Sequence, residues 1–133
     1  MLKLDKKFYL RPAIESARDY LGKVLVHETS EGRISGIITD VEAYLAFYDQ
    51  VHHGNKKTPR TEVMWQEGGY AYIYLIYGTW NQLAVVVNTE NIPDVVFIRG
   101  VYPLQGKELM RKQWAKEVIT DFIPQKLFAF LES

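Results

Sequence analysis

Alternating apolar and polar residues in the first part of the chain predict paired strands. Residues 34–44 carry this alternation, and residues 23–28 carry a shorter version of it. Turn-forming residues at positions 30–32 lie between the two segments, so an antiparallel hairpin is predicted for them. Gly36, inside the longer strand, indicates a bulge or a close approach of another backbone segment.

Three further strands are predicted in the second half of the chain. Residues 70–77 alternate tyrosine with aliphatic residues, residues 83–87 form the return strand, and residues 95–101 are almost continuously apolar. The hairpin between the first two would carry large aromatic residues at its tip. An exposed aromatic tip is unfavourable in water unless something binds it.

Helical spacing is found near both ends of the chain. Pro12 is predicted at the first position of a helix that ends at Gly22. The residues predicted to face the core from this helix are Ile14, Ala17 and Leu21, with Tyr20 as a further candidate. Residues 104–117 predict a second helix, and residues 118–133 a short third one that packs back on the domain.

A long loop over residues 46–60 separates the predicted hairpins, and loops of this length in compact domains are usually functional or disordered. Thr61 is predicted to cap a short helical turn over residues 61–65.

Composition limits the class of protein without choosing a function. The chain has 133 residues, of which 47% are apolar and 24% charged, so one globular domain over residues 1–133 is predicted. The 16 basic and 16 acidic residues balance, so bulk charge does not indicate nucleic-acid binding, whereas a local basic patch stays compatible. The absence of cysteine excludes disulfides and thiolate chemistry. Since neither a signal peptide nor a membrane span is recognisable, an intracellular protein that does not bind membranes is expected.

Glu42, at the end of the strand over residues 34–44, is the first candidate for chemistry. Strict alternation places it on one face with Ile38 and Tyr44, which is an apolar and aromatic setting for a carboxylate. On spacing alone, a carboxylate at a strand end is most often solvated or paired with a lysine. A site carried on a rigid scaffold is the alternative.

Two histidines lie in the loop over residues 46–60, and histidine is a common metal ligand. His52 and His53 are adjacent, with Asp49 and His27 as conceivable further ligands. Adjacent side chains point in different directions, and no third ligand is spaced convincingly, so no metal site is predicted.

Several motifs, read together, carry a family likeness that runs in unbroken order from about residue 8 to about residue 112. The N-terminal motifs are Phe8, Pro12-Ala13, Ala17 and Tyr20–Val26. The later motifs are Asp40–Tyr44, His53, Thr58–Arg60, Tyr72–Gly78 and Arg99–Gly106. Taken together, they resemble the alkyladenine (3-methyladenine) DNA glycosylase family.

The resemblance implies an α+β fold, with a single mixed domain, a curved and mainly antiparallel sheet flanked by helices, and a protruding β-hairpin. It implies a monofunctional DNA repair enzyme that flips an alkylated or deaminated purine out of duplex DNA and hydrolyses the N-glycosidic bond with water. No cofactor or metal is implied, and a monomer is expected. Two alternatives stay open: a truncated relative that binds DNA or purines with weak or no cleavage, and a small-molecule binding barrel without a nucleic-acid role.

The resemblance also assigns roles to individual residues. Glu42 matches the residue that activates the water, and Arg99 matches an arginine that helps to hold this water and could keep Glu42 ionised. The residues that match the base pocket are Tyr44, His53, Tyr74 and Ala84, and Ala84 stands where the family has an asparagine that discriminates against guanine. Tyr77 matches the wedge that enters the minor groove, and Lys56, Lys57 and Arg60 would contact phosphates.

Each assignment has a simpler alternative. Arg99 could form an ordinary ion pair with Asp40 or Glu42, the tyrosines could form a cross-strand ladder, and the basic loop residues could be solvated. Tyr77 could fold back on Trp80. The family sequence continues beyond the position of Ser133, so a glycine-rich pocket segment is expected to be missing from these residues. The expected location is the cytoplasm with its nucleoid in a bacterium, and the nucleus or an organelle in a eukaryote.

Overall fold

Six strands form one antiparallel sheet in the computed structural model, which describes residues 3–49, 52–76, 80–115 and 130–132. The strands are β1 (Val24–Thr29), β2 (Gly32–Tyr44), β3 (Ala71–Ile76), β4 (Trp80–Val87), β5 (Asp94–Gln105) and β6 (Phe130–Glu132), in the order β3-β4-β5-β2-β1-β6. The helices are α1 (Ala13–Tyr20) and α2 (Lys107–Ala115), with the 3-10 turns η1 (Lys6–Tyr9), η2 (His53–Asn55) and η3 (Glu62–Trp65). The predicted α+β fold is therefore confirmed.

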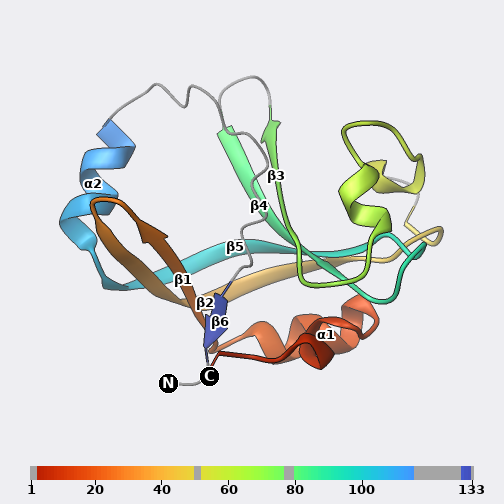
Figure 1. Cartoon of the computed structure of the whole chain (residues 1–133), viewed down its shortest axis with the longest axis horizontal. Coiled ribbons are helices and arrows are strands. Elements are labelled where there is room, and N and C mark those ends of the chain that lie inside the picture. Colours follow the sequence, from red (N-terminus) through yellow and green to blue (C-terminus); the bar gives the residue numbers. More distant parts are fainter. Residues whose placement is uncertain (1–2, 50–51, 77–79, 116–129, 133) are drawn as a thin grey trace.

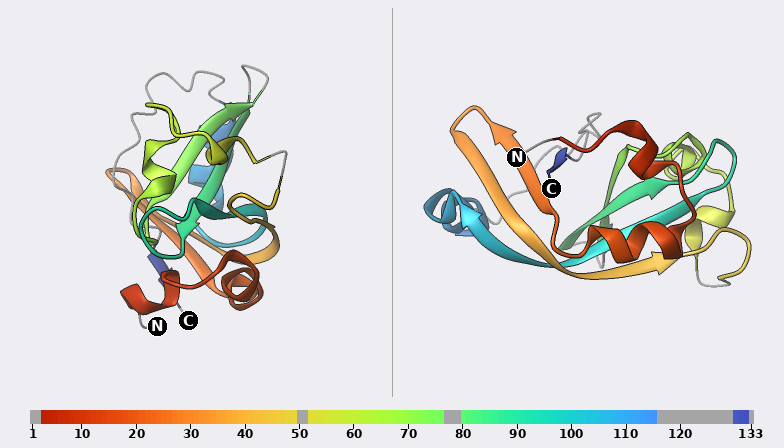
Figure 2. Two further views of the ribbon diagram at one scale, coloured as in Figure 1. Left: turned by 90° about the vertical axis from the view of Figure 1, so that its right-hand side faces the viewer. Right: turned by 90° about the horizontal axis from the view of Figure 1, so that it is seen from below.

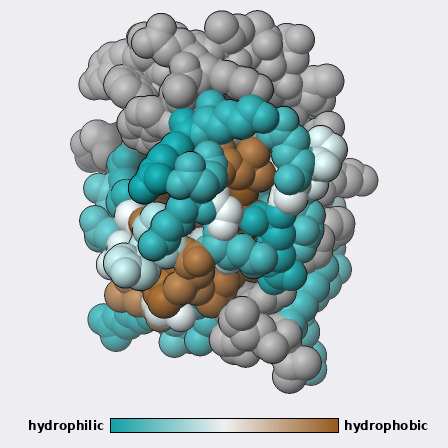
Figure 3. All heavy atoms as spheres, turned by 90° about the vertical axis from the view of Figure 1, so that its left-hand side faces the viewer, coloured by the Kyte–Doolittle hydropathy of each residue, from teal (hydrophilic) through white to brown (hydrophobic). Residues whose placement is uncertain are grey.

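The long strands β2 and β5 arch across the molecule, with α1 packed on one side of them (Figure 1). The β3–β4 hairpin rises on the other side, as predicted, and its tip at residues 77–79 lies outside the described residues. At the end of the sheet around α2, hydrophilic side chains surround separate apolar patches (Figure 3). Apolar exposure at that end is divided, unlike the continuous patch that is typical of a docking face.

Irregularities in the β2–β5 ladder accompany the curvature of the sheet that Figure 2 shows. The register shifts between Ser35 and Gly36, and again between Ile38 and Val41. A Cβ atom on Gly36 would overlap the side chain of Val101, so the predicted close approach at this glycine is confirmed. Bulges of this kind bend a strand and increase its local twist.

The second irregularity also changes which side chains face which side of the sheet. Ile38, Val41 and Ala43 all pack against one core cluster, although strict alternation would separate Ile38 from the other two. Tyr44 packs against the other cluster. The prediction that Glu42 shares a face with Ile38 is therefore wrong, because the bulge reverses the alternation, whereas Glu42 and Tyr44 do share a face.

Each side of the sheet has its own apolar core. The cluster beneath α1 contains Tyr9, Ala13, Ala17, Tyr20, Ile38, Val85, Val87 and Val96. The cluster on the opposite side contains Met64, Tyr72, Ala84, Val86, Val95 and Phe97. The second cluster supports the predicted site, since Glu42 and Tyr44 lie on that side.

The buried stripe of α1 differs from the predicted one. Ile14 and Leu21 are 47% and 48% exposed, whereas the buried residues are Ala13, Ser16, Ala17 and Tyr20. Pro12 is the N-cap residue and not the first helical residue. Gly22 follows the helix with a φ of 83°, as expected of a glycine that ends a helix.

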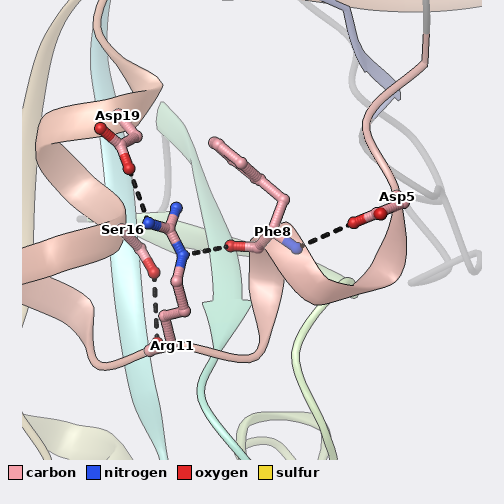
Figure 4. A network of polar contacts seen from close by, with 5 residues as sticks. All are labelled: Asp5, Phe8, Arg11, Ser16 and Asp19. Atoms are coloured by element: carbon pink, nitrogen blue, oxygen red, sulfur yellow. Dashed lines mark hydrogen bonds and ion pairs between the residues drawn. The ribbon is translucent and has the colours of Figure 1, made fainter.

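A network around Arg11 ties η1 to α1 (Figure 4). The Arg11 Nε–H donates to the Phe8 carbonyl at 3.1 Å, and its Nη1–H donates to the Asp19 carboxylate at 2.6 Å. The Ser16 hydroxyl donates to the Arg11 carbonyl at 3.2 Å, and the Phe8 N–H donates to the Asp5 carboxylate at 3.3 Å. This network positions the segment that covers one face of the sheet.

Three boundaries differ from the sequence predictions. β5 extends to Gln105, so α2 begins only at Lys107 and not at residue 104. Residues 130–132 form strand β6, whereas a helix was expected in the tail, and residues 116–129 lie outside the described part. Thr61 precedes η3 but makes no capping bond, because its hydroxyl donates to the Lys56 carbonyl at 2.7 Å.

Candidate active site

Glu42 and Arg99 form an ion pair across the β2–β5 ladder. The Arg99 Nε–H donates to Glu42 Oε2 at 2.5 Å, and Arg99 Nη2 contacts the same oxygen. The Glu42 side chain is 48% exposed and that of Arg99 30%, so the pair is open to water. The two residues predicted to be catalytic are thus brought together, and the simpler pairing of Arg99 with Asp40 is not the one formed.

The pKa of Arg99 reflects this environment. Partial burial lowers the pKa of the guanidinium, but the hydrogen bond and the negative charge of Glu42 outweigh it, and smaller contributions from Tyr44 act in the same direction. The net result is a pKa above the ordinary value for arginine. Arg99 is therefore a permanent cation beside the Glu42 carboxylate.

A row of paired residues leads across the sheet to Glu42. The ladder pairs Tyr72 with Ala84, Ala84 with Phe97, and Phe97 with Glu42. Tyr72, Ala84 and Phe97 all belong to the second core cluster. The carboxylate therefore stands at the end of a packed apolar row, where the core gives way to solvent.

Phe97 packs against both Tyr44 and Arg99, and the sequence pattern did not predict this role. Its ring lies 4.9 Å from the Tyr44 ring at an interplanar angle of 76°, and the Arg99 guanidinium carbon lies 5.3 Å from its centroid. Phe97 itself is buried. Its position two residues before Arg99 in one strand was the available signal, because such residues share a face. Phe97 therefore fixes the spacing between the aromatic and the ionic parts of the site.

His52 is the buried histidine of the loop. Its Nε2 lies 2.5 Å from the Pro93 carbonyl, so Nε2 carries the proton, because a carbonyl oxygen can only accept. Its ring centroid lies 5.7 Å from that of Tyr44. His53, the histidine predicted to bind the base, belongs to η2, and its side chain lies outside the described part. Among the described residues, no group of three or more acidic or histidine side chains could hold a metal ion.

Of the other predicted base-pocket residues, the structure describes the side chain of Ala84 but not that of Tyr74. Ala84 is 0% exposed between Tyr72 and Phe97, so in this structure it offers no surface to a base. Tyr74 pairs with Gln82, and its side chain lies outside the described part, as does the whole of Tyr77. The base-binding and wedge assignments for these residues stay predictions.

The three basic residues lie on exposed backbone between η2 and η3. Lys56, Lys57 and Arg60 are all exposed. Lys57 also lines a hollow of about 370 Å³ whose other lining residues include Glu62, Glu67, Trp65, Tyr70 and Glu90. Carboxylates near Lys57 reduce its attraction for phosphate. The assignment of phosphate contacts to the three basic residues stays a prediction.

Comparison with known proteins gives the family. A model of the methylpurine-DNA glycosylase family matches residues 7–127. The chain belongs to this family. Members similar to it include proteins named "Putative 3-methyladenine DNA glycosylase" from Clostridium acetobutylicum, Clostridium novyi and Alkaliphilus oremlandii.

These three relatives are 41%, 44% and 38% identical to the chain over 95%, 80% and 95% of its length. The matched parts cover 62%, 53% and 63% of the three relatives, so the chain spans less than two thirds of the length of each of these three proteins. In the described part, no helix is both long and apolar enough to cross a membrane.

Proposed function

We propose that this member of the methylpurine-DNA glycosylase family removes alkylated or deaminated purines from duplex DNA by hydrolysing the N-glycosidic bond. The observation that carries the proposal is the Glu42–Arg99 ion pair, half open to water and placed over Phe97 beside Tyr44. Base loss passes through a sugar with oxocarbenium character, which a nearby carboxylate stabilises.

In this proposal, Glu42 is the general base that activates the water. Arg99 contacts Oε2 through two nitrogens, so we assign the water to Oε1. Arg99 also places a permanent positive charge beside the Glu42 carboxylate. A water on Oε1 would lose a proton to Glu42 as its oxygen attacks the anomeric carbon of the sugar. The N-glycosidic bond breaks in the same reaction, and its electron pair leaves with the purine.

In the same proposal, the aromatic residues near Glu42 bind the flipped base. Tyr44, on the face of Glu42, would stack on the base together with His53 and Tyr74, and Tyr77 would fill the space that the base leaves in the helix. Phosphate contacts from the exposed basic segment at residues 56–60 would orient the duplex.

Single-turnover base release tests this function. Duplexes carrying hypoxanthine, 1,N6-ethenoadenine or 3-methyladenine are mixed with excess protein, and the free base is separated and quantified. We expect release of at least one of these bases from duplex DNA. If the protein binds the duplexes but releases none of the bases, the binding-only alternative is correct.

Salt dependence tests the assigned phosphate contacts. We expect the duplex affinity to fall steeply as the salt concentration rises. If Lys56, Lys57 and Arg60 each neutralise one phosphate, the logarithm of the association constant plotted against the logarithm of the salt concentration should have a slope of about −3. Lys56→Gln should reduce this slope by about one. Lys107→Gln, in α2 at the other end of the sheet, is the matched control and should leave the slope unchanged. A slope near zero would favour a small-molecule binder.

Arg99→Lys tests the geometry of the ion pair separately from its charge. Lysine keeps the charge but cannot hold one oxygen with two nitrogens in a plane, so Glu42 loses its fixed orientation. We expect base release to slow by about tenfold or more. Stability should change by less than about 1 kcal/mol, because the pair is partly exposed. If stability and release fall in proportion, Arg99 is only a structural residue.

A further inference from the structure

Gln82 carries a buried polar atom that the fold leaves without a partner. Its side-chain oxygen Oε1 is shielded from solvent, and it accepts no hydrogen bond from the residues that the structure describes. Buried acceptors are nearly always satisfied in native proteins, since an unmade hydrogen bond costs free energy. An unsatisfied acceptor at this position therefore calls for an explanation.

The strand pattern places Gln82 on the same side of the sheet as the candidate active site. Ala84 and Val86 belong to the cluster that contains Phe97, and β4 pairs with β3 without a register shift from Ala71–Val85 to Ile76–Trp80. Residues two apart in a strand share a face, so Gln82 faces the same side as Ala84.

Gln82 also follows directly on the end of the ladder that joins β4 to the strand of Arg99. The last residue pair of the β4–β5 ladder joins Leu83 to Ile98, so Gln82 and Arg99 are the next residues of their two strands beyond that pair. Arg99 lies over the ring of Phe97, which fixes its face as the one that Gln82 occupies. The strand pattern thus places Gln82 and Arg99 on one face of the sheet, each one residue beyond the last pair of the β4–β5 ladder.

Among positions 82, 84 and 86, which face the site from β4, only Gln82 can form a side-chain hydrogen bond. The other two are the buried residues Ala84 and Val86. A base held near Tyr44 and Glu42 would therefore find a single group among these three positions that can form a hydrogen bond. A single polar group in an apolar wall is the usual arrangement for choosing one ligand edge over another.

We propose that Gln82 reads the hydrogen-bonding edge of the flipped purine, with Oε1 accepting a bond from an N–H group of the base. This inference rests on the proposed base-excision function. The terminal torsion of glutamine is soft, and the buried oxygen gives up no hydrogen bond when the amide turns toward a ligand. The residue therefore favours bases with an N–H donor on the six-membered ring or its amino group, and gains nothing from bases without one.

The test compares two bases that differ in this donor. Hypoxanthine carries an N1–H group, whereas 1,N6-ethenoadenine has no N–H outside the glycosidic nitrogen. For Gln82→Met, which keeps the length of the side chain and removes the amide, we expect hypoxanthine release to fall by about tenfold or more. Release of 1,N6-ethenoadenine should change by less than about twofold. Gln105→Met, at the exposed far end of β5, is the matched control and should change neither rate.

Thermal unfolding distinguishes recognition of the base by Gln82 from a purely structural role of this residue. Because Gln82→Met removes an unsatisfied buried acceptor, we expect its midpoint to equal or exceed that of the wild type. A lower midpoint with equal losses for both bases would show that Gln82 only supports the fold. Unchanged release of both bases would also overturn the assignment, while leaving the proposed function in place.

If the wild type releases no base from any duplex, the proposed function fails, and titration with free hypoxanthine and free 1,N6-ethenoadenine decides on Gln82. Weaker binding of hypoxanthine by Gln82→Met, with 1,N6-ethenoadenine binding unchanged, would retain Gln82 as a purine-reading residue. Equal affinities for wild type and variant, or no binding of hypoxanthine by the wild type, would overturn it.

Discussion

Replacing Glu42 by glutamine is expected to slow base release by about a thousandfold, which lies in the range attributed to a positioned general base. The amide keeps the size of the side chain and can still accept a hydrogen bond from Arg99, but it cannot take a proton from water. Duplex binding should stay within about twofold, since the substitution leaves the cationic segment at residues 56–60 unchanged. Single-turnover release and equilibrium binding on one lesion duplex measure the two effects.

Glu28→Gln is the matched control for this substitution. Glu28 also belongs to a partly exposed cross-strand ion pair, with Arg33 at 3.2 Å, but this pair joins β1 to β2 away from the candidate active site. We expect Glu28→Gln to release base at the wild-type rate. Equal rates for Glu42→Gln and the wild type would remove Glu42 from the mechanism, whatever the activity of the protein.

Asp94→Ala is expected to destabilise the protein by about 3–5 kcal/mol, the largest stability effect that the structure indicates. Asp94 Oδ1 accepts from the Ala46 N–H at 2.7 Å, and Oδ2 accepts from the Ala13 N–H and the Asn88 side-chain amide, both at 3.0 Å. The residue is buried, so truncation leaves donors without partners in the interior. Denaturant unfolding with an unchanged m-value measures the loss.

Asp5→Ala provides the comparison for Asp94→Ala. Asp5 also accepts a backbone N–H at the start of a helical turn, but the bond is exposed and joins residues three apart. We expect Asp5→Ala to cost less than about 1 kcal/mol. A loss of similar size for the two variants would show that Asp94 does not join α1, the loop after β2 and the start of β5 as we infer.

The strand pattern of the chain was readable because its physical cause is local. Residues 23–28 and 34–44 alternate in the way that a half-buried sheet requires, and both are strands. Gly22 was interpretable for the same reason, since glycine is favoured where φ is positive. Each of these predictions depends on the residue and its immediate neighbours.

Contacts between residues distant in the sequence explain the features that the hydrophobic pattern did not predict. Asp94 reads as an ordinary loop residue, yet it accepts bonds from Ala13 and Ala46, which are distant in the sequence. Ile14 fits a helical stripe, but the sheet packs against a different side of α1 and leaves it half exposed. Periodicity gives the width of an apolar face and does not say which partner covers it.

The candidate active site divides in the same way. The sequence by itself determined the residue types, with Glu42 and Tyr44 at one strand end and Arg99 near the end of another, and the family likeness assigned their proposed roles. Only the tertiary structure decided that Glu42 bonds Arg99, and that Phe97 supports both Arg99 and Tyr44. The physical reason is the bulge between Ile38 and Val41, because its reversal of the alternation depends on how β2 pairs with β5.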